Sequence, residues 1–260
     1  MAVAPARGGR PGAAHASLET PSDAELDECP FCAGREDRTP PETLRIGEPW
    51  QVRVVPNLYP ALERQEVVVH VPRHARSLAE LSGEELELVA EAWQRRRREV
   101  PAGYLHALVN EGREAGGSLP HSHSQLVWLA NPPPATQHGV ERDRWAGVSE
   151  LDGLVLACPY ASRLPYECVI APASPRSDAF GDPFLAAAVR LLGDAIRRLH
   201  RHVGAIPLNA WLHDGPDWHI ELLPRLTILA GLELGAGIYV NTVLPEAAAA
   251  TLAGRAEPPG

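Results

Sequence analysis

The sequence predicts an α+β fold of two similar halves, each with antiparallel strands and a packed helix. Two β-rich runs that end at proline, then a helix and two further strands, occur twice at an offset of roughly 100 residues. A proline-rich stretch that opens at Asn131 separates the two copies. Hydrophobic residues make up 45% and charged residues 22% of the 260 residues, which is the balance of a globular chain.

The first copy begins with two β-rich runs, and we expect its strands over residues 50–56, 66–72, 105–110 and 121–130. A helix should begin at Ser82, because Ser82 and Glu85 have the spacing of a capping box. Apolar residues then recur on one helical face, which predicts that this face packs against the sheet; they are Leu86, Val89, Ala90 and Trp93.

The second copy repeats this pattern, with strands expected over residues 154–159, 167–172, 206–212 and 218–223. Its helix should run from residue 183 to about residue 202. We therefore expect halves of residues 26–140 and 141–254. Residues 1–25 are rich in Ala, Gly, Pro and Arg without periodicity, which predicts a disordered leader.

Several classes of function are disfavoured by composition. No apolar run reaches the length of about 18 residues that a membrane span requires, and the N-terminus lacks the apolar core of a secretory signal. A net charge of −9 disfavours a nucleic-acid partner. Four cysteines are too few for a disulfide scaffold. We expect a cytoplasmic protein with neither membrane nor nucleic acid as partner.

Cys29 and Cys32 have the spacing of a zinc knuckle, in which two thiolates bind one Zn²⁺ through a tight turn. The other two cysteines, Cys158 and Cys168, stand in apolar strand runs and are expected to be buried. Histidines must therefore supply the remaining ligands of such a site. The candidates are His70, His74, His121 and His123.

A second concentration of polar chemistry lies in the His-x-His-x-Gln segment of His121, His123 and Gln125. On a strand these three side chains share one face. The segment follows a glycine-rich loop, residues 110–118, whose backbone N–H groups can contact a phosphate without side-chain obstruction. A glycine loop followed by an imidazole nucleophile suits phosphoryl or nucleotidyl transfer.

Taken together, these motifs resemble galactose-1-phosphate uridylyltransferase, the transferase branch of the histidine-triad superfamily. The likeness rests on the Cys-x2-Cys pair, the segment around His74, the glycine loop and the His-x-His-x-Gln segment, and it continues through residues 219–224 and 230–233. It implies two histidine-triad-like halves and a homodimer. It also implies a UDP-sugar donor, a sugar 1-phosphate acceptor, and a role in galactose metabolism.

The resemblance implies a role for each matching residue. His123 would attack the α-phosphorus to form a uridylyl-histidine, and Gln125 would hydrogen-bond the phosphoryl oxygens, together with Ser118. The nucleotide and its phosphates would contact Asn57, Asn110, Gly116 and Gly117. Glu233 would bind the hexose hydroxyls.

The resemblance also implies a structural zinc on Cys29, Cys32, His74 and His121, with His70 as the rival of His74. An offset of 98 residues maps His121 to His219 and His123 to Glu221, so the second copy would lack the nucleophile. From the resemblance, Glu141, His213, His219 and Glu221 are candidate ligands of a second Zn or Fe site. The alternative is that His219 and Glu221 are a hydrogen-bonded pair that stabilises the strand.

The chain departs from the family pattern at the sugar site, where Leu232 replaces a usual aromatic residue and Thr227 stands where a lysine can occur. The acceptor is therefore open between galactose 1-phosphate, another sugar phosphate and phosphate itself. One alternative is an ADP-sugar phosphorylase that uses the same covalent histidine. Another is a zinc-stabilised binding module without catalysis.

Overall fold

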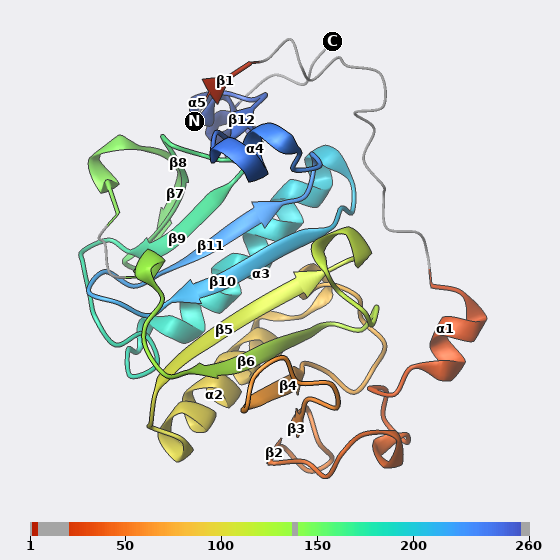
Figure 1. The fold of residues 1–260 in the computed structure, drawn as a ribbon. Coiled ribbons are helices and arrows are strands. Elements are labelled where there is room, and N and C mark those ends of the chain that lie inside the picture. Colours follow the sequence, from red (N-terminus) through yellow and green to blue (C-terminus); the bar gives the residue numbers. More distant parts are fainter. Residues whose placement is uncertain (1, 5–20, 137–139, 256–260) are drawn as a thin grey trace.

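One face of a ten-stranded sheet is covered by two long helices, while the other face is left open toward the viewer in Figure 1. This computed structural model describes residues 2–4, 21–136 and 140–255. The helices behind the sheet are α2, Gly83–Glu99, and α3, Phe184–Val203. The predicted α+β class is confirmed.

The large sheet is formed by ten strands: β2 (Leu44–Ile46), β3 (Val52–Pro56), β4 (Gln65–Val69), β5 (Tyr104–Glu111), β6 (His123–Leu129), β7 (Trp145–Leu151), β8 (Leu154–Pro159), β9 (Cys168–Pro172), β10 (Leu208–His213) and β11 (His219–Pro224). Two short parallel strands form a separate pair: β1 (Ala2–Val3) and β12 (Val240–Asn241). The short helices are α1 (Asp23–Glu28), α4 (Gly231–Ala236) and α5 (Pro245–Leu252).

The strand order of the large sheet is β2-β3-β4-β6-β5-β10-β11-β9-β8-β7. We call β3, β4, β5, β6 and α2 the first half, and β8, β9, β10, β11 and α3 the second half. The order within the second half mirrors that within the first. The halves do not keep separate sheets, because β5 and β10 pair antiparallel from Leu208↔Glu111 to Trp211↔Leu108.

The ladders also fix which residues of the two halves are equivalent. Gln125 lies between Val67 of β4 and Leu108 of β5. Glu221 lies in the same way between Val169 of β9 and Trp211 of β10.

Glu221 is therefore the counterpart of Gln125, and His219, two residues earlier, is the counterpart of His123. The mapping of His121 to His219 by sequence offset is wrong by two residues. A simple offset fails because connections of different length separate the strands of the two halves.

Helix α2 begins as the sequence predicts. Ser82 accepts a hydrogen bond from the Glu85 N–H, and the Glu85 carboxylate accepts from the Ser82 N–H, which completes the capping box. The predicted apolar face is buried against the sheet and α3. Its Leu86 side chain packs so closely on α3 that a Cβ at Gly193 would lie 2.6 Å from it.

Three segments differ from the sequence-based expectation, and one of them is β1, which lies inside the expected leader and pairs with β12. Residues 145–151, placed in the polar boundary stretch, form β7 on the edge of the sheet. Helix α1 begins inside the expected leader, at Asp23, while residues 5–20 of that leader lie outside the described residues. Helix α1 has no buried residue and β7 has one, so apolar periodicity gave no signal for either.

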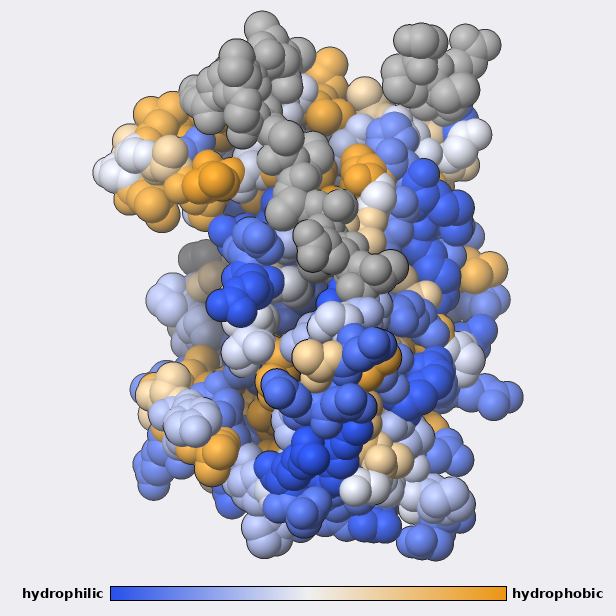
Figure 2. All heavy atoms as spheres, turned by 90° about the vertical axis from the view of Figure 1, so that its right-hand side faces the viewer, coloured by the Kyte–Doolittle hydropathy of each residue, from blue (hydrophilic) through white to orange (hydrophobic). Residues whose placement is uncertain are grey.

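Seen from the side, the open face of the sheet is recessed between an upper and a lower lobe (Figure 2). Apolar side chains gather on the upper lobe at the height of α4, where Ile228, Leu232, Leu234 and Ile238 are exposed. Within the described ranges, no helix is both long and apolar enough to cross a bilayer.

Candidate active site and metal centre

His123 is the first residue of β6 and points to the open face of the sheet. Its Nδ1 lies 2.6 Å from the carbonyl oxygen of His121, so Nδ1–H donates to that carbonyl and the Nε2 lone pair is left without a proton. The edge of the Phe31 ring, 5.6 Å away between centroids, packs on the imidazole. Burial lowers the pKa of His123, which favours the neutral, nucleophilic form.

Gln125, two residues along β6, lies on the same open face. Its Oε1 accepts a hydrogen bond of 2.5 Å from Gln65 Nε2, and the Ala61 N–H in turn donates to Gln65 Oε1. This chain of bonds fixes the Gln125 amide so that its NH2 group faces the site as a donor. Sequence reasoning missed Gln65, because its partner is 60 residues away along the chain.

The glycine loop folds back over the end of β5. A Cβ at Gly117 would lie 2.8 Å from the carbonyl oxygen of Asn110, so only glycine fits there. Gly116 has φ +85°, a left-handed conformation that L side chains rarely adopt. Ser118 ends the loop and is exposed. The loop thus presents backbone and a hydroxyl, rather than bulky side chains, to the open face.

Asn110 closes the site on the side of β10. Its Oδ1 accepts a 2.7 Å hydrogen bond from Nδ2 of Asn209, which also donates to the Ala115 carbonyl. The second half therefore holds the glycine loop of the first. Asn209 was missed by sequence reasoning, since only the β5–β10 pairing brings it to the loop.

Two other predicted residues, Asn57 and Glu233, lie away from the centre of the site. Asn57 follows β3, and its Oδ1 accepts from the Tyr59 N–H, which folds the exposed β3–β4 connection. Glu233 caps its own helix, α4, by accepting from the Ala230 N–H. That helix stands at the top of the molecule, beyond β11 and far from β6 (Figure 1). The structure does not bring Glu233 to His123 within this chain.

The four residues predicted to bind zinc come together beside His123. One ligand atom from each of Cys29, Cys32, His74 and His121 lies within 4.8 Å of the others. The distances from Nδ1 of His121 to the two sulfurs are 3.3 and 3.7 Å, and His74 Nδ1 is 3.5 Å from Cys32 Sγ. A tetrahedral zinc with ordinary bond lengths separates S and N by about 3.6 Å, so the donor set fits the metal.

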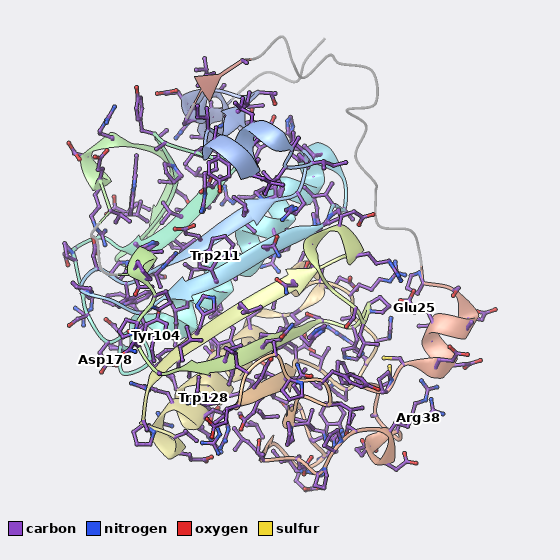
Figure 3. The ribbon with its side chains drawn as sticks, in the orientation of Figure 1. Glu25, Arg38, Tyr104, Trp128, Asp178 and Trp211 are labelled. Atoms are coloured by element: carbon purple, nitrogen blue, oxygen red, sulfur yellow. The ribbon has the colours of Figure 1, made fainter. Side chains whose placement is uncertain are left out.

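The Nε2 atoms of His121 and His74, which face away from the sulfurs, are also held by hydrogen bonds. His121 Nε2 donates to the Val71 carbonyl at 3.0 Å, and His74 Nε2 donates to the Glu25 carboxylate at 2.9 Å. Each bond leaves the Nδ1 lone pair facing the sulfurs, as in many zinc sites. Glu25 stands on α1, at the right of Figure 3. Burial, followed by the neighbouring Cys29, raises the pKa of Cys32 to about 11, so a thiolate here needs a cation beside it.

His70, the rival of His74, is excluded by its contacts. It is fully buried, with Nδ1 2.9 Å from the Ser122 hydroxyl and Nε2 3.0 Å from the Ser124 hydroxyl. Both ring nitrogens are occupied, so His70 ties β6 to the segment before α2. Cys158 and Cys168 are buried in β8 and β9 as expected.

In the second half, His213, His219 and Glu221 form another compact group. His219 Nδ1 donates to the Asp217 carbonyl at 2.9 Å, the same local bond that His123 makes. The His213 and His219 rings stack 4.7 Å apart, and both Nε2 atoms face Glu221 Oε1, at 3.0 and 3.5 Å. The sequence placed Glu141 in this group, but its carboxylate pairs with Arg144 instead.

Arg163 changes the charge of this second group. Its guanidinium bridges the carboxylates of Glu167 and Glu221 and lies over the Trp211 ring, in the middle of β10 (Figure 3). Burial would raise the pKa of Glu221, but hydrogen bonds from His213 and His219 and the charge of Arg163 hold it well below its usual range. A cavity of about 260 Å³ opens here, lined by Glu141, Tyr160, Arg163, Glu167, His219 and Glu221 among others.

Comparisons with known sequences find relatives over most of the chain. Residues 58–133 match the family model of the N-terminal domain of galactose-1-phosphate uridyl transferase. The chain is similar to ADP-glucose phosphorylase of Arabidopsis thaliana, at 24% identity over 93% of this chain and 86% of the relative. It is also similar to galactose-1-phosphate uridylyltransferase of Thermotoga maritima, at 22% identity over 91% and 92%.

Among solved structures, the chain is similar to the Arabidopsis thaliana ADP-glucose phosphorylase with bound ADP-glucose. The TM-score is 0.83 and the identity 25%, over 96% of this chain and 94% of that one. The resemblance inferred from the motifs is confirmed.

Proposed function

Because this chain is a relative of the galactose-1-phosphate uridylyltransferases, we propose that it is a nucleotidyltransferase that carries a nucleoside monophosphate on His123. The proposal is carried by two features that β6 presents together on the open face. The bond from His123 Nδ1 to the His121 carbonyl fixes the tautomer and leaves Nε2 without a proton. Beside it, Gln125 is a neutral amide whose oxygen is occupied by Gln65, and the second half has a carboxylate at that position. Nothing in the described chain hydrogen-bonds Nε2 of His123, so it is available to a phosphorus atom.

The reaction has two balanced steps. His123 Nε2 attacks the α-phosphorus of a nucleotide sugar; the N–P bond forms, and the bond to the bridging oxygen breaks. A sugar 1-phosphate leaves with the electron pair on that oxygen. An oxygen of a second phosphate then attacks the same phosphorus, the N–P bond breaks, and the imidazole is restored.

Charge that develops on the α-phosphoryl oxygens would be stabilised by the NH2 group of Gln125 and by the glycine loop with Ser118. Gln65 supports this role, because it occupies the oxygen of Gln125 and leaves the amide nitrogen to donate. Asn110 and Asn57 border the same face and are proposed to contact the nucleotide. Glu233 is proposed to reach a hexose only from a partner subunit, since it lies far from His123 in its own chain.

The base and the acceptor separate two candidate functions. The first is uridylyl transfer from UDP-glucose to a hexose 1-phosphate, as the motif pattern suggests. The second is phosphorolysis of an ADP-sugar, in which inorganic phosphate is the acceptor. The similarity to an ADP-glucose phosphorylase over 93% of this chain favours the second.

For the metal, we propose a structural Zn²⁺ on Cys29, Cys32, His74 and His121, which would cross-link the N-terminal segment to the start of β6. A second metal remains a proposal for His213, His219 and Glu221, without Glu141. We further propose that residues 26–140 and 141–254 are duplicated halves, supported by the mirrored strand order. The exposed apolar residues around α4 support a homodimer.

The decisive experiment is intact mass after the protein is mixed with UDP-glucose or ADP-glucose and quenched at alkaline pH, where phosphoramidates persist. We expect a mass gain of one nucleoside monophosphate with one donor and none in His123→Ala. His202→Ala, on α3 behind the sheet, is the matched control and should keep the adduct. An equal mass gain in His123→Ala would remove the proposal, and no gain with any nucleotide sugar would favour the binding module.

A further inference from the structure

Arg225 is a cation that the fold leaves without a counter-charge. It follows β11 and is partly buried, and it forms no ion pair with any residue that the structure describes. Its Nη1 donates 3.2 Å to Asn209 Oδ1, while its Nε is buried without an acceptor. Burying an unpaired charge is costly, so such an arginine is ready to receive an anion.

Two other arginines, Arg96 and Arg163, show the contrast. Arg96 is held by both oxygens of Glu66, and Arg163 by Glu167 and Glu221. In each case carboxylates satisfy the guanidinium. Among the described residues, the guanidinium of Arg225 bonds only to the oxygen of a neutral amide. A charged fork with free donors is the group that proteins use to bind phosphate bidentately.

Asn209 connects this cation to the glycine loop. Its nitrogen donates to Asn110 and to the Ala115 carbonyl, and its oxygen accepts from Arg225. Every polar atom of the Asn209 side chain is thus used for positioning. Trp211, labelled in the middle of the open face in Figure 3, stands two residues further along the same face of β10.

Strand registers give the distance to His123. Asn209 pairs with Asn110, and the β5–β6 register, continued by two residues, sets Asn110 beside His123. Two strand spacings, or about 10 Å, therefore separate His123 from Asn209. A phosphate joined to the α-phosphate by one bridging oxygen would lie between His123 and Arg225 if it were directed across β5 toward β10.

We propose that Arg225, positioned by Asn209, forms the subsite for the second phosphate: the one that leaves with the sugar and the one that enters as acceptor. The ligand class is a phosphate dianion, either a sugar phosphate monoester or inorganic phosphate. This inference rests on the proposed function and deepens it. Arg225 binds the ligand, whereas Asn209 is a positioning residue that orients both Arg225 and Asn110.

The test measures discharge of the nucleotidyl group to phosphate separately from its formation, and it uses the intact protein. Nucleotidyl-His123 is formed from the active nucleotide sugar, and its discharge is followed by mass at increasing inorganic phosphate or hexose 1-phosphate. In Arg225→Gln the concentration for half-maximal discharge should rise on the order of 10- to 100-fold, because charge-assisted bonds are lost. Arg225→Lys should recover part of the affinity, and Asn209→Ala should shift it less in the same direction.

Arg190→Gln is the control, because Arg190 lies on α3 behind the sheet and pairs with Glu87. An unchanged half-maximal concentration in Arg225→Gln would overturn the subsite. The ratio of the values for phosphate and hexose 1-phosphate identifies the natural acceptor.

The proposed function is tested separately, by whether the wild-type protein forms the adduct. If no adduct forms, equilibrium dialysis with labelled pyrophosphate tests the subsite independently. Loss of pyrophosphate binding in Arg225→Gln would support it, and equal affinity in both proteins would refute it.

Discussion

The starts of β6 and β11 share one local geometry and differ in their chemistry. His123 and His219 each open a strand, and each donates from Nδ1 to the carbonyl two residues before it. Two residues later the first half has the amide of Gln125 and the second half the carboxylate of Glu221. The backbone frame for an imidazole nucleophile is thus present twice.

The surroundings decide which imidazole can face a phosphate. In the first half, Gln65 binds Gln125 amide to amide, so a neutral donor remains. In the second, Glu167 and Glu221 occupy the equivalent positions and are bridged by Arg163. Two carboxylates beside His219 would repel a phosphate, and Arg163, the cation that contacts them, is already engaged. If His123 is the nucleophile as proposed, tautomer control alone does not make a nucleotidyl site, and the neutral donor at Gln125 is the distinguishing feature.

The largest expected effect concerns the metal, which the first half is proposed to hold on two cysteines. We predict that Cys29→Ser loses zinc and is destabilised on the order of 5 kcal/mol, because metal binding adds directly to folding free energy. Cys158→Ala, in a buried strand of the second half, should keep its zinc. Elemental analysis and thermal unfolding measure both.

Equal zinc content in Cys29→Ser and wild type would contradict the four-ligand assignment. A wild-type content near two metals per chain, reduced in His219→Ala, would establish the second site. A wild-type content near one metal per chain would mean that His213, His219 and Glu221 form a hydrogen-bonded cluster without a metal.

A reciprocal exchange of side chains sharpens the comparison. Gln125→Glu places a carboxylate where a donor is needed, so adduct formation should fall by about 10²- to 10³-fold while the fold is kept. Glu221→Gln should leave the adduct intact but cost about 3 kcal/mol, because Arg163 loses one of its two carboxylate partners. Single-turnover mass measurements and denaturant unfolding separate the two outcomes, and equal adduct rates in Gln125→Glu and wild type would count against Gln125.

The smallest effect concerns a feature that both halves share. Glu111 at the end of β5 accepts from the Leu78 N–H before α2, and Asp214 after β10 accepts from the Ala179 N–H before α3. Burial raises the pKa of Glu111 to about 7 and raises that of Asp214. The folded state then holds a proton on Glu111 that the unfolded state releases above its usual pKa of 4.5.

Stability should therefore fall as pH rises from 4.5 to about 7 and then level off. We predict that Glu111→Gln, which keeps the acceptor for Leu78, removes this slope and is more stable than wild type at pH 8, on the order of 2 kcal/mol. Unfolding free energies between pH 5 and pH 8 check it. A variant with the wild-type slope would show that Glu111 does not carry the dependence.

Short sequence patterns predicted much of the fold. The capping box at Ser82 and the apolar face of α2 are local, and periodicity predicted both. Proline-terminated β runs located most strands to within a few residues. The sequence did not predict β7, because few of its residues are buried. It also did not predict that His219 is equivalent to His123, because strand register is visible only in the pairing of the strands.

The candidate site likewise contains residues that short sequence motifs predict and residues that they do not. His123, Gln125 and the proposed zinc ligands lie in short motifs with recognisable spacing. Gln65, Asn209 and Arg225 do not, because each acts through a partner distant in sequence. Tertiary pairing brings them to the site, and no single window of sequence contains that information.

The pairing of β5 with β10 also limits how this protein can be divided. A fragment that ends before residue 141 would expose the backbone donors and acceptors of β5, an edge that favours strand addition. Such a fragment would associate with itself along β5, as two copies related by a two-fold axis. If the two halves arose by the proposed duplication, the β5–β10 seam corresponds to the interface of an ancestral dimer, and fusion of its chains would leave each half free to take a different chemistry.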